Sequence, residues 1–454
     1  MPETRNHSLV SFKDGIIRLA MKIGFISLGC AKNLVDSEHI IGLFDDPFFE
    51  YEYDLKKCEA ILINTCGFIL DAKQESIDTI LDIAEYKNNN LKKLIVTGCF
   101  STRYYEECIK EFPEVDLFVK ISDYHKLQQM LSELFDHKFI NSYGHNRQLV
   151  NNNYSAYLKI SDGCNCGCSF CAIPSIRGPY KSESIETLID EAKFLKEKGI
   201  KELTLVAQDS TRYGLDLYKK LSLSDLLKEL DKLDFKWIRI LYMYPETINE
   251  ELLDAIKHSK SVLPYFDIPI QYGNDEILKA MNRRGDTNLI REKINMIRRY
   301  FPEAVIRTTI LLGFPNETDE TFEDTMNLIN EIEFDSLGAF TYSKEEGTLA
   351  YSMKNQVDED LKKKRYEILM KRQYEIVLSK NKNRLNREYE VLIDSYDYIR
   401  NRYIGRTYMS APDGVDGCVY IDSDEELKIG DFYNVQMSDY NDYDLIGIIK
   451  KKEV

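Results

Sequence analysis

Apolar strands alternate with amphipathic helices along most of this chain, and this alternation constrains its fold more than any other feature. Near the start of the chain the pattern predicts three strands, at residues 23–28, 60–63 and 94–97, and two helices, at residues 34–44 and 71–86. Because parallel strands are joined by crossover helices, such alternation predicts an α/β fold with a parallel sheet. We expect this fold in a first domain, residues 21–140.

A cysteine follows each of these three strands: Cys30, Cys66 and Cys99. In an open α/β sheet the carboxyl ends of parallel strands share one edge, and ligands bind at that edge. A single free cysteine is most often a small buried hydrophobic residue. Three at equivalent strand ends, with glycine beside them, are harder to explain by packing, so we predict that they hold one iron–sulfur cluster. Three others lack this placement and are interpreted as packing or surface residues: Cys58, Cys108 and Cys418.

The same alternation resumes after about residue 150 and predicts six further strands. They are expected in the segments AYLKIS, ELTLVAQD, WIRILYMYP, YFDIPIQ, AVIRTTILLGF and SLGAFTYS, with long amphipathic helices between them. Six such units predict a partial or open parallel (β/α)6 barrel over a second domain, residues 150–380. Active sites of β/α barrels lie at the carboxyl ends of the strands, which directs attention to the loop after the first strand.

That loop contains Cys164, Cys168 and Cys171 with a Cys-x3-Cys-x2-Cys spacing. Three thiolates so close in sequence can hold three corners of a four-iron cluster, and they leave the fourth iron without a protein ligand. An iron with an open position can bind a reactant. The alternative is a structural zinc site with Cys166 as the fourth ligand, because such sites use four protein ligands in a tetrahedron.

Polar side chains are also expected to cap other strands of the predicted barrel on the same carboxyl-end face. We single out Gln208 and Arg307 as candidates for binding and orienting a charged cofactor, although each could equally form structural hydrogen bonds at a strand end. The sequence has neither a phosphate-binding loop nor a Gly-x-Gly-x-x-Gly fingerprint, so nucleotide hydrolysis and nicotinamide chemistry have no support. The charge run DEDLKKKR, residues 358–365, is expected to form a solvated helix face.

Short strands with turn residues between them replace this pattern near the end of the chain. Five of them, in a third domain at residues 383–454, suit a small antiparallel β-barrel of the oligonucleotide-binding kind. Residues 382–454 contain ten Lys and Arg against fifteen Asp and Glu, a net charge of −5. A barrel that binds a polyanion is normally basic, so this charge favours a basic protein substrate. The alternative is a local nucleic-acid patch made of Arg402, Tyr403, Arg406 and Tyr408.

The whole chain has 454 residues, which suggests several domains, and a net charge of −16. Its ten cysteines, without a signal peptide, indicate a reducing cytoplasm in which thiols bind metal and do not form disulfides. No stretch reaches the roughly 18 apolar residues of a membrane span, so no membrane association is expected. Residues 1–20 carry no targeting pattern and are expected to be a disordered leader.

Together these features resemble the radical S-adenosylmethionine methylthiotransferases, over nearly the whole chain from Met21 onward. The resemblance rests on the two cysteine triads, on the terminal barrel, which is similar to a TRAM domain, and on five long motifs. Within the family, the motifs resemble the branch that acts on ribosomal protein S twelve (uS12): SLGCAKNLVDSE, NTCGFI, AIPSIRG, VAQDSTRYGLDLY and RTTILLGFPNET.

The resemblance implies two [4Fe–4S] clusters and S-adenosylmethionine as cofactors. One cluster, whose open iron chelates S-adenosylmethionine, would be held by a set that we call the radical triad: Cys164, Cys168 and Cys171. The other would carry the sulfur and would be held by the auxiliary triad: Cys30, Cys66 and Cys99. One-electron cleavage of S-adenosylmethionine would give a 5′-deoxyadenosyl radical that takes hydrogen from the β-carbon of an aspartate of uS12, and that carbon would then capture the sulfur. A flavodoxin or ferredoxin would donate the electron.

Two residues depart from the usual pattern of the family. Cys166 lies inside the radical-triad loop where the family commonly has a residue without a thiol, and Tyr272 stands where the uS12 branch often has histidine. Two rival functions remain. One is a tRNA methylthiotransferase that uses the same two clusters on a hypermodified adenosine, which the acidic terminal barrel makes the less favoured reading. The other is a scaffold without catalytic activity that binds zinc or RNA.

Overall fold

The computed structural model describes residues 10–11, 17–18, 20–144 and 146–449. Within the predicted leader, the described elements are two short antiparallel strands, β1 (Val10–Ser11) and β2 (Ile17–Arg18). The remainder of that prediction lies outside the described residues. In the part of the chain that the structure describes, no helix combines the length and the apolar character that a membrane crossing requires.

The described residues pack into two units. The first contains the residues up to Asn151 together with the short segment Ala172–Gly178, and the second contains Asn152–Cys171 and the residues from Pro179 onward. The predicted second and third domains therefore belong to one unit. The predicted domain boundaries stay predictions.

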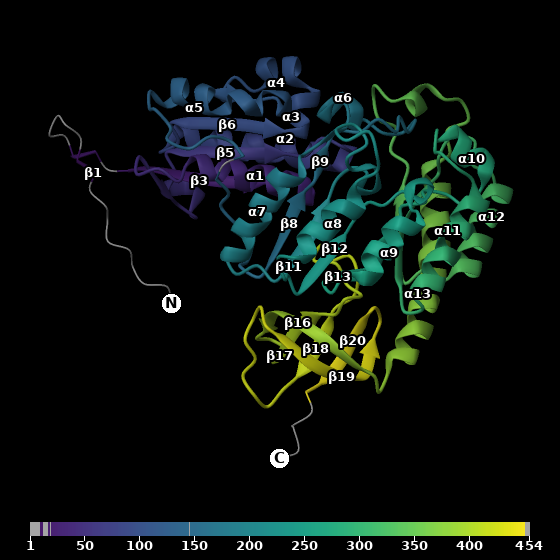
Figure 1. Ribbon diagram of the computed structural model, residues 1–454. Helices are drawn as coiled ribbons and strands as arrows, with labels where there is room; N and C mark the ends of the chain where they lie inside the picture. Colours follow the sequence, from purple (N-terminus) through teal and green to yellow (C-terminus); the bar gives the residue numbers. More distant parts are fainter. Residues whose placement is uncertain (1–9, 12–16, 19, 145, 450–454) are drawn as a thin grey trace. The chain divides into compact units, whose positions relative to one another are not determined.

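A five-stranded parallel sheet in the order β4-β3-β5-β6-β7 forms the centre of the first unit (Figure 1). The middle strand β5 is buried along its length, with Ala60 and Leu62 in one apolar core and Ile61 and Ile63 in another. Because successive side chains of a strand point to opposite faces, the two cores lie on opposite faces of the sheet. This confirms the predicted parallel α/β fold. The strands are β3 (Met21–Ser27), β4 (Phe49–Tyr51), β5 (Ala60–Thr65), β6 (Lys93–Gly98) and β7 (Leu117–Phe118).

Helices and short 3₁₀ turns connect these strands. Cys58 and Cys108 are buried in the second core, as the packing interpretation expects. The connecting elements are α1 (Ala31–Leu43), η1 (Leu55–Lys57), α2 (Leu70–Ala84), η2 (Glu85–Asn88), α3 (Cys99–Arg103), α4 (Tyr105–Glu111), η3 (Ile121–Lys126) and α5 (Leu127–Phe135), and α6 (Ile173–Arg177) also packs in this unit.

A six-stranded parallel sheet forms the larger part of the second unit, with its strands side by side in chain order. The first and last strands remain at its two edges, so the sheet is an open barrel, as predicted. Four strands lie inside the segments predicted from the sequence, whereas β8 begins one residue before its segment and β13 begins three residues before its segment. The strands are β8 (Ser155–Lys159), β11 (Glu202–Val206), β12 (Trp237–Ile240), β13 (Val262–Asp267), β14 (Val305–Leu312) and β15 (Ser336–Thr341).

Helices follow the strands of this open barrel. Several begin at a polar residue whose side chain accepts a hydrogen bond from the first turn, which satisfies a backbone N–H that would otherwise lack a partner. These residues are Ser184, Asn249, Asn274, Asp286 and Thr318. The helices are α7 (Ile185–Glu197), α8 (Leu223–Asp231), α9 (Glu250–His258), α10 (Asp275–Ala280), α11 (Thr287–Tyr300) and α12 (Asp319–Ile332), and the shorter elements are β9 (Ser161–Asp162), β10 (Lys181–Ser182), η4 (Ser210–Arg212), η5 (Pro245–Thr247) and η6 (Leu349–Ser352).

The long helix α13 (Glu359–Arg384) leads from the open barrel to the terminal domain, which is yellow in Figure 1. The prediction that residues 358–365 form a solvated face is wrong for two of the cations, because Lys362 and Arg365 are buried. Arg365 Nη1 donates to Glu317 Oε1 at 2.7 Å, and Lys362 Nζ donates to the Tyr342 carbonyl oxygen at 2.9 Å. Glu317 and Tyr342 lie 48 and 20 residues away in the sequence, so the charge run alone could not reveal these two contacts.

Five strands at the end of the second unit close into the predicted small barrel. Neighbouring strands are antiparallel except β18 and β20, whose parallel pairing closes the barrel. Its interior is apolar, with Val391, Ile393, Ile421, Val435 and Met437 all buried. The strands are β16 (Glu388–Asp397), β17 (Arg402–Arg406), β18 (Val419–Asp422), β19 (Phe432–Asn441) and β20 (Asp444–Ile448).

A buried ion network joins this barrel to the six-stranded sheet. Glu202, the first residue of β11, accepts hydrogen bonds from Arg406 Nη2 at 2.8 Å and from Arg239 Nε at 3.3 Å. Arg406 also donates to Asp394 Oδ2 at 2.7 Å, and Ser155 donates to Glu202 at 3.0 Å. The charges compensate one another, which is the condition under which charged side chains remain buried.

Candidate functional site

The auxiliary triad lies at one edge of the sheet of the first unit. Cys30, Cys66 and Cys99 follow β3, β5 and β6, which are neighbours in the parallel sheet. Cys30 precedes the first residue of α1, and Cys99 is the first residue of α3. The predicted gathering of these cysteines at the carboxyl edge is therefore observed.

The three thiols are close enough to affect one another's ionisation. Burial raises the pKa of Cys66, and the charge of Cys30 adds to this shift. Burial also raises the pKa of Cys99, to about 12, with contributions from both other thiols. For Cys30, loss of hydration raises the pKa, but Lys32, Arg177 and backbone N–H groups of α1 outweigh it and leave the pKa lowered. Because the charges of the thiolates raise one another's pKa, a cationic guest between them would stabilise all three thiolates.

Glycines let the backbone approach this triad closely. Gly29 has a φ of +90°, and a Cβ added to it would lie 3.0 Å from Cys66 Sγ. Gly98 has a φ of +100°, and its Cβ would lie 2.3 Å from Asn64 Oδ1 and 2.4 Å from the Thr65 carbonyl oxygen. Left-handed backbone in so little space admits glycine alone. The backbone therefore forms a cradle around the three sulfur atoms.

We expect Gly98→Ala to remove about half of the bound iron, because the added Cβ displaces the backbone that presents Cys66 and Cys99. Gly144→Ala is the matched control. Gly144 has a φ of +87°, and nothing lies within 4 Å of an added Cβ, so this variant has the backbone strain of about 1–2 kcal/mol without the clash. Iron per chain after anaerobic reconstitution is the measurement. Equal iron in the two variants would rule out the cradle.

Asn33 connects the strand ends around the auxiliary triad. Its Nδ2 donates to the Leu28 and Thr65 carbonyl oxygens, each at 3.0 Å, and its Oδ1 lies 3.5 Å from Cys99 Sγ. Arg177, the last residue of α6, donates to the same Oδ1 at 2.6 Å. One amide thus links the ends of β3 and β5 to a cysteine and to a buried cation.

The radical triad lies in the loop that follows β8 and β9 in the second unit, at the carboxyl end of the sheet, as predicted. The residues after α10 hold this loop. The Met281 carbonyl oxygen accepts from the Ser169 backbone N–H at 2.9 Å, and Asn282 Nδ2 donates to the Gly167 carbonyl oxygen at 2.7 Å. Within the loop, the Cys171 N–H donates to the Cys168 carbonyl oxygen at 3.0 Å. These bonds fix the backbone that presents the thiols.

Arg283 provides a cation beside the radical triad. Its Nη1 lies 3.8 Å from Cys168 Sγ, and its Nη2 donates to the Pro269 carbonyl oxygen at 2.8 Å. The guanidinium carbon lies 4.2 Å from the centroid of the Tyr244 ring, a cation–π contact. Burial raises the pKa of Cys168, and Arg283 opposes that shift. The arginine therefore favours the thiolate, which is the form that binds iron.

Cys166 is placed differently from its three neighbours. Its Sγ donates to Asp209 Oδ2 at 3.8 Å, and its backbone N–H lies 3.4 Å from Cys164 Sγ. The hydrogen bond between the two side chains raises the pKa of Cys166 and lowers the pKa of Cys164, and burial raises the pKa of Cys166 further. The contact with Asp209 therefore distinguishes Cys166 from the three cysteines of the radical triad.

The described donor set fits a multi-iron cluster better than a single ion. In the described ranges, no three His, Cys, Asp or Glu side chains surround a position that suits one metal ion. A structural zinc site needs four ligands around one point. A [4Fe–4S] cluster needs no such point, because each thiolate binds a different iron. Three cysteines match the number of protein ligands of a cluster that keeps one iron open.

Gln208 lies just beyond the carboxyl end of β11, the strand next to β8. Its Nε2 donates to Asp162 Oδ1 at 3.3 Å, while its Oε1 is buried and has no hydrogen-bond partner among the described residues. A buried acceptor without a donor is costly unless a ligand supplies one. Binding of S-adenosylmethionine by Gln208 stays a prediction, and the free acceptor agrees with a ligand that carries N–H groups.

Arg307 is the third residue of β14, so the prediction that it caps the carboxyl end of a strand is wrong, and it lies toward the amino end. Its Nη1 lies 2.7 Å from Asp413 Oδ2 and 3.7 Å from Asp416 Oδ2, both from the terminal domain, and its Nε lies 3.5 Å from Asp267 Oδ1. The guanidinium also donates to Tyr265 Oη at 3.3 Å. A role of Arg307 in binding the cofactor stays a prediction, and these carboxylates give the arginine a structural role.

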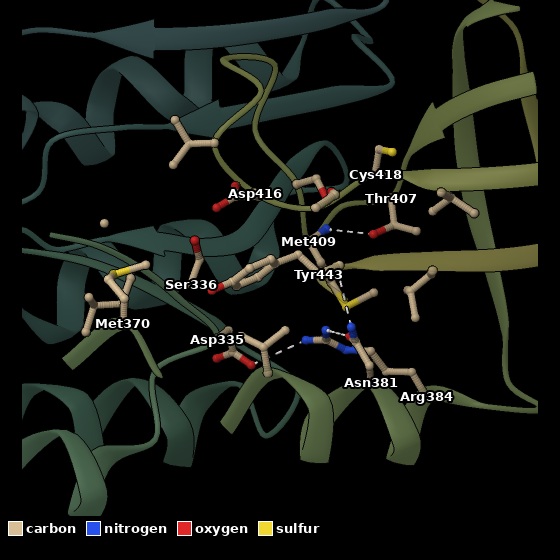
Figure 2. A pocket seen from close by; sticks show the side chains of 18 of the residues that line it. Asp335, Ser336, Met370, Asn381, Arg384, Thr407, Met409, Asp416, Cys418 and Tyr443 are labelled. Carbon is tan, nitrogen blue, oxygen red and sulfur yellow. Dashed lines mark hydrogen bonds and ion pairs between the residues drawn. The ribbon is translucent and has the colours of Figure 1, made fainter. Parts of the chain in front are cut away.

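A cavity of about 280 Å³ lies between β15, α13 and the terminal barrel. Figure 2 shows the Arg384 guanidinium between Asp335 and Asn381, with which it forms contacts of 3.5 Å and 2.7 Å. Cys418 is the cysteine that lines this cavity, and no member of either triad does. The polar groups of Asp335, Asn381 and Arg384 are thus joined by hydrogen bonds, and the cavity is separate from the two cysteine triads.

Two arginines that neighbour the triads, Arg177 and Arg283, are not among the site residues predicted from the sequence. Arg177 belongs to the AIPSIRG motif but received no role, and Arg283 follows α10 in a stretch that was not singled out. Arg283 is 115 residues from Cys168, and Arg177 is 144 residues from Asn33. Arg177 could have been predicted from its position close to the Cys-x3-Cys-x2-Cys motif, because cations stabilise thiolates.

Three family models match the chain. The Radical SAM superfamily model matches residues 158–329, the model described as Uncharacterized protein family UPF0004 matches residues 22–120, and the TRAM domain model matches residues 387–449. Each match falls within one of the three domains predicted from the sequence. The TRAM match agrees with the closed five-stranded barrel.

The chain is similar over nearly its whole length to proteins named Ribosomal protein uS12 methylthiotransferase RimO. The protein of Thermoanaerobacter sp. (strain X514) is 45% identical over 435 residues, which cover 94% of this chain and 99% of that protein. The protein of Acetivibrio thermocellus is 45% identical over 443 residues, covering 94% and 98%. The protein of Clostridioides difficile (strain 630) is 45% identical over 438 residues, again covering 94% and 98%.

Among solved structures, the radical S-adenosylmethionine methyltransferase TsrM from Kitasatospora setae, with cobalamin and a [4Fe–4S] cluster bound, has a TM-score of 0.53. Its sequence identity is 13%, and the match covers 71% of this chain and 75% of that chain, so it supports the fold alone. The relatives and the domain matches decide the family. The chain belongs to the RimO family of ribosomal protein uS12 methylthiotransferases, within the radical S-adenosylmethionine superfamily.

Proposed function

We propose that this enzyme attaches a methylthio group to the β-carbon of an aspartate of ribosomal protein uS12. One observation carries the proposal: relatives named for methylthiolation of uS12 are about 45% identical over 94% of the chain. A cysteine triad in each unit supports it, because sulfur insertion and methyl transfer require more than one reactive centre.

Two [4Fe–4S] clusters and S-adenosylmethionine are the cofactors, as predicted. When bound, they supply the one-electron cleavage of the sulfonium and the sulfur that is transferred. We assign one cluster to the auxiliary triad and the other to the radical triad. The glycine cradle supports the first assignment, and the position of the loop at the carboxyl end of β8 supports the second.

In this proposal the residues of the chain bind the two clusters, orient S-adenosylmethionine and balance charge. The three thiolates of each triad hold a cluster and leave one iron open to a reactant. Gln208 offers its unpaired Oε1 to the amino group of S-adenosylmethionine. Arg283 lies beside Cys168 and favours its thiolate, and the Cys166 thiol donates to Asp209.

The contacts of the terminal barrel favour a protein substrate over tRNA. The four residues of the alternative nucleic-acid patch all have partners inside the protein. Arg406 is buried against Glu202. The other partners are Asp422 for Arg402, the Leu427 N–H for Tyr403 and the Glu303 carbonyl oxygen for Tyr408. With a net charge of −5 over residues 382–454, this domain is suited to a basic protein.

A direct comparison of the two substrates tests the proposal. Anaerobically reconstituted enzyme, S-adenosylmethionine, sulfide and a chemical reductant are incubated with uS12 and with a tRNA that carries the hypermodified adenosine, at equal concentrations. We expect mass spectrometry to find the methylthio mass gain on one aspartate-containing peptide of uS12, and Cys171→Ala to abolish it. A mass gain on tRNA without one on uS12 would support the alternative substrate.

Two further parts of the proposal concern the surroundings of the enzyme. We propose a flavodoxin or ferredoxin as electron donor, because the cleavage requires a one-electron reductant of low potential. We also propose that the enzyme works in the cytoplasm, because its substrate is a ribosomal protein and because free thiols bind clusters in a reducing compartment. Purified donors of both kinds, compared by the rate of S-adenosylmethionine cleavage, test the first point.

A further inference from the structure

Arg177 is a cation buried beside the auxiliary triad, although it follows the radical triad in the sequence. It ends α6, six residues after Cys171, and this short helix packs in the first unit. The side chains of Arg177 and Asp36 are each 1% exposed and are joined by a contact of 2.9 Å. Burying an arginine is costly, so its partners and position require an explanation.

Polar and apolar contacts place the segment Ala172–Gly178 against Cys99 of the auxiliary triad. Arg177 Nη2 donates to Asn33 Oδ1 at 2.6 Å, and this oxygen lies 3.5 Å from Cys99 Sγ. Burial raises the pKa of Cys99, and both the charge of Arg177 and its hydrogen bond oppose that rise. Ala172 and Ile176, from the same segment, pack on Cys99. One face of this segment thus provides apolar and cationic contacts to a single ligand.

We propose that Arg177 is a positioning residue of the auxiliary cluster, which it holds in place and makes easier to reduce by balancing negative charge beside Cys99. The inference rests on the auxiliary cluster of the proposed function. Arg177 would act on the auxiliary cluster without being a ligand, although it follows the radical triad in the sequence.

The effect follows from charge and geometry. Three thiolates make the auxiliary site anionic, and reduction adds a further negative charge. Net charge and hydrogen bonds to the cysteine sulfurs are known determinants of the reduction potential of iron–sulfur clusters, and a buried cation acts through a low dielectric. The planar fork of an arginine can bind Asn33 and Asp36 at once, whereas a lysine offers a point charge. Charge and fork can therefore be tested separately.

The experiment uses the full chain with Cys164, Cys168 and Cys171 replaced by alanine, so that the auxiliary cluster alone remains. In this background we compare Arg177→Lys with Arg177→Gln/Asp36→Asn, a pair that removes both buried charges together. Iron per chain and the midpoint potential, from a redox titration followed by electron paramagnetic resonance, are measured. The double variant keeps the net charge of the site but removes the charge and the hydrogen bond by which Arg177 acts on Cys99. We therefore expect a more negative potential in the double variant and a smaller shift of the same sign in Arg177→Lys.

Arg147 and Glu38 provide the matched control, because Glu38 of α1 forms another buried ion pair with Arg147, with Arg147 Nε 2.9 Å from Glu38 Oε2. Arg147→Gln/Glu38→Gln should leave the potential unchanged. Unchanged potentials in both Arg177 variants, or an equal shift in the control, overturn the inference. Loss of iron in the Arg177 variants but not in the control, with equal thermal midpoints, supports it. A background protein that binds no iron overturns the auxiliary cluster itself, and the inference with it.

Discussion

Replacement of the radical triad by alanine is expected to reduce cleavage of S-adenosylmethionine to the background without enzyme and to remove about half of the iron. Replacement of the auxiliary triad should also remove about half of the iron but leave cleavage intact. The reason is structural: the residues of the radical triad follow one another in a single loop of the second unit, and the auxiliary triad lies in the first. Iron analysis and chromatography of 5′-deoxyadenosine are the measurements.

The cysteines outside the two triads provide a control for this experiment. The combined Cys58→Ala, Cys108→Ala and Cys418→Ala variant should keep its full iron, because two of these residues lie in an apolar core and the third lines the separate cavity. If the variant without the auxiliary triad kept its full iron, the cysteines of the auxiliary triad would bind no cluster. If the variant without the auxiliary triad kept the iron of the radical triad but no longer cleaved S-adenosylmethionine, the two sites would not act separately.

Glu202→Gln is expected to lower the free energy of unfolding by about 3–5 kcal/mol, the range for breaking a buried ion pair. The variant keeps the shape of Glu202 but removes the charge that compensates Arg239 and Arg406, both of which are buried. It therefore loosens the junction between the open barrel and the terminal barrel. We expect this to be the largest single-residue effect on stability outside the apolar cores.

The only tryptophan of the chain reports on this junction. Trp237 begins β12, and its ring meets Phe432, at the start of β19, with centroids 4.7 Å apart at 79°. Urea unfolding followed by tryptophan fluorescence therefore measures the change. Glu331→Gln, which breaks an exposed contact of 2.8 Å with Arg291, serves as the control and should cost less than about 1 kcal/mol. Equal midpoints for the two variants would show that the network contributes nothing.

Much of the fold could be predicted because strands and crossover helices have distinct periodicities. The six strands of the open barrel and the strand-end placement of the auxiliary triad follow from that pattern and from the rule for parallel sheets. The parallel closing pair of the terminal barrel, β18 and β20, was not predicted, because strand order in a barrel depends on contacts between distant segments.

The pattern of strands and helices does not predict the partners of the buried arginines. Arg283 acts on Cys168 across 115 residues, and Arg365 pairs with Glu317 across 48 residues, so their partners are set by the fold. A charge run is usually solvated, and the prediction of a solvated face at residues 358–365 is wrong because two of its cations are buried. Gln208 was chosen as a polar residue at a strand end, and its unpaired oxygen became visible only in the structure.

The central claim is that each triad holds three irons of a [4Fe–4S] cluster and leaves the fourth iron free of protein ligands. Anomalous diffraction at the iron edge, from crystals of the anaerobically reconstituted protein, tests it most directly. We expect two four-iron clusters, one bound by Cys30, Cys66 and Cys99 and one by the radical triad, each with an iron that no side chain touches. Zinc at either site, or Cys166 on the fourth iron of the radical cluster, would contradict the account.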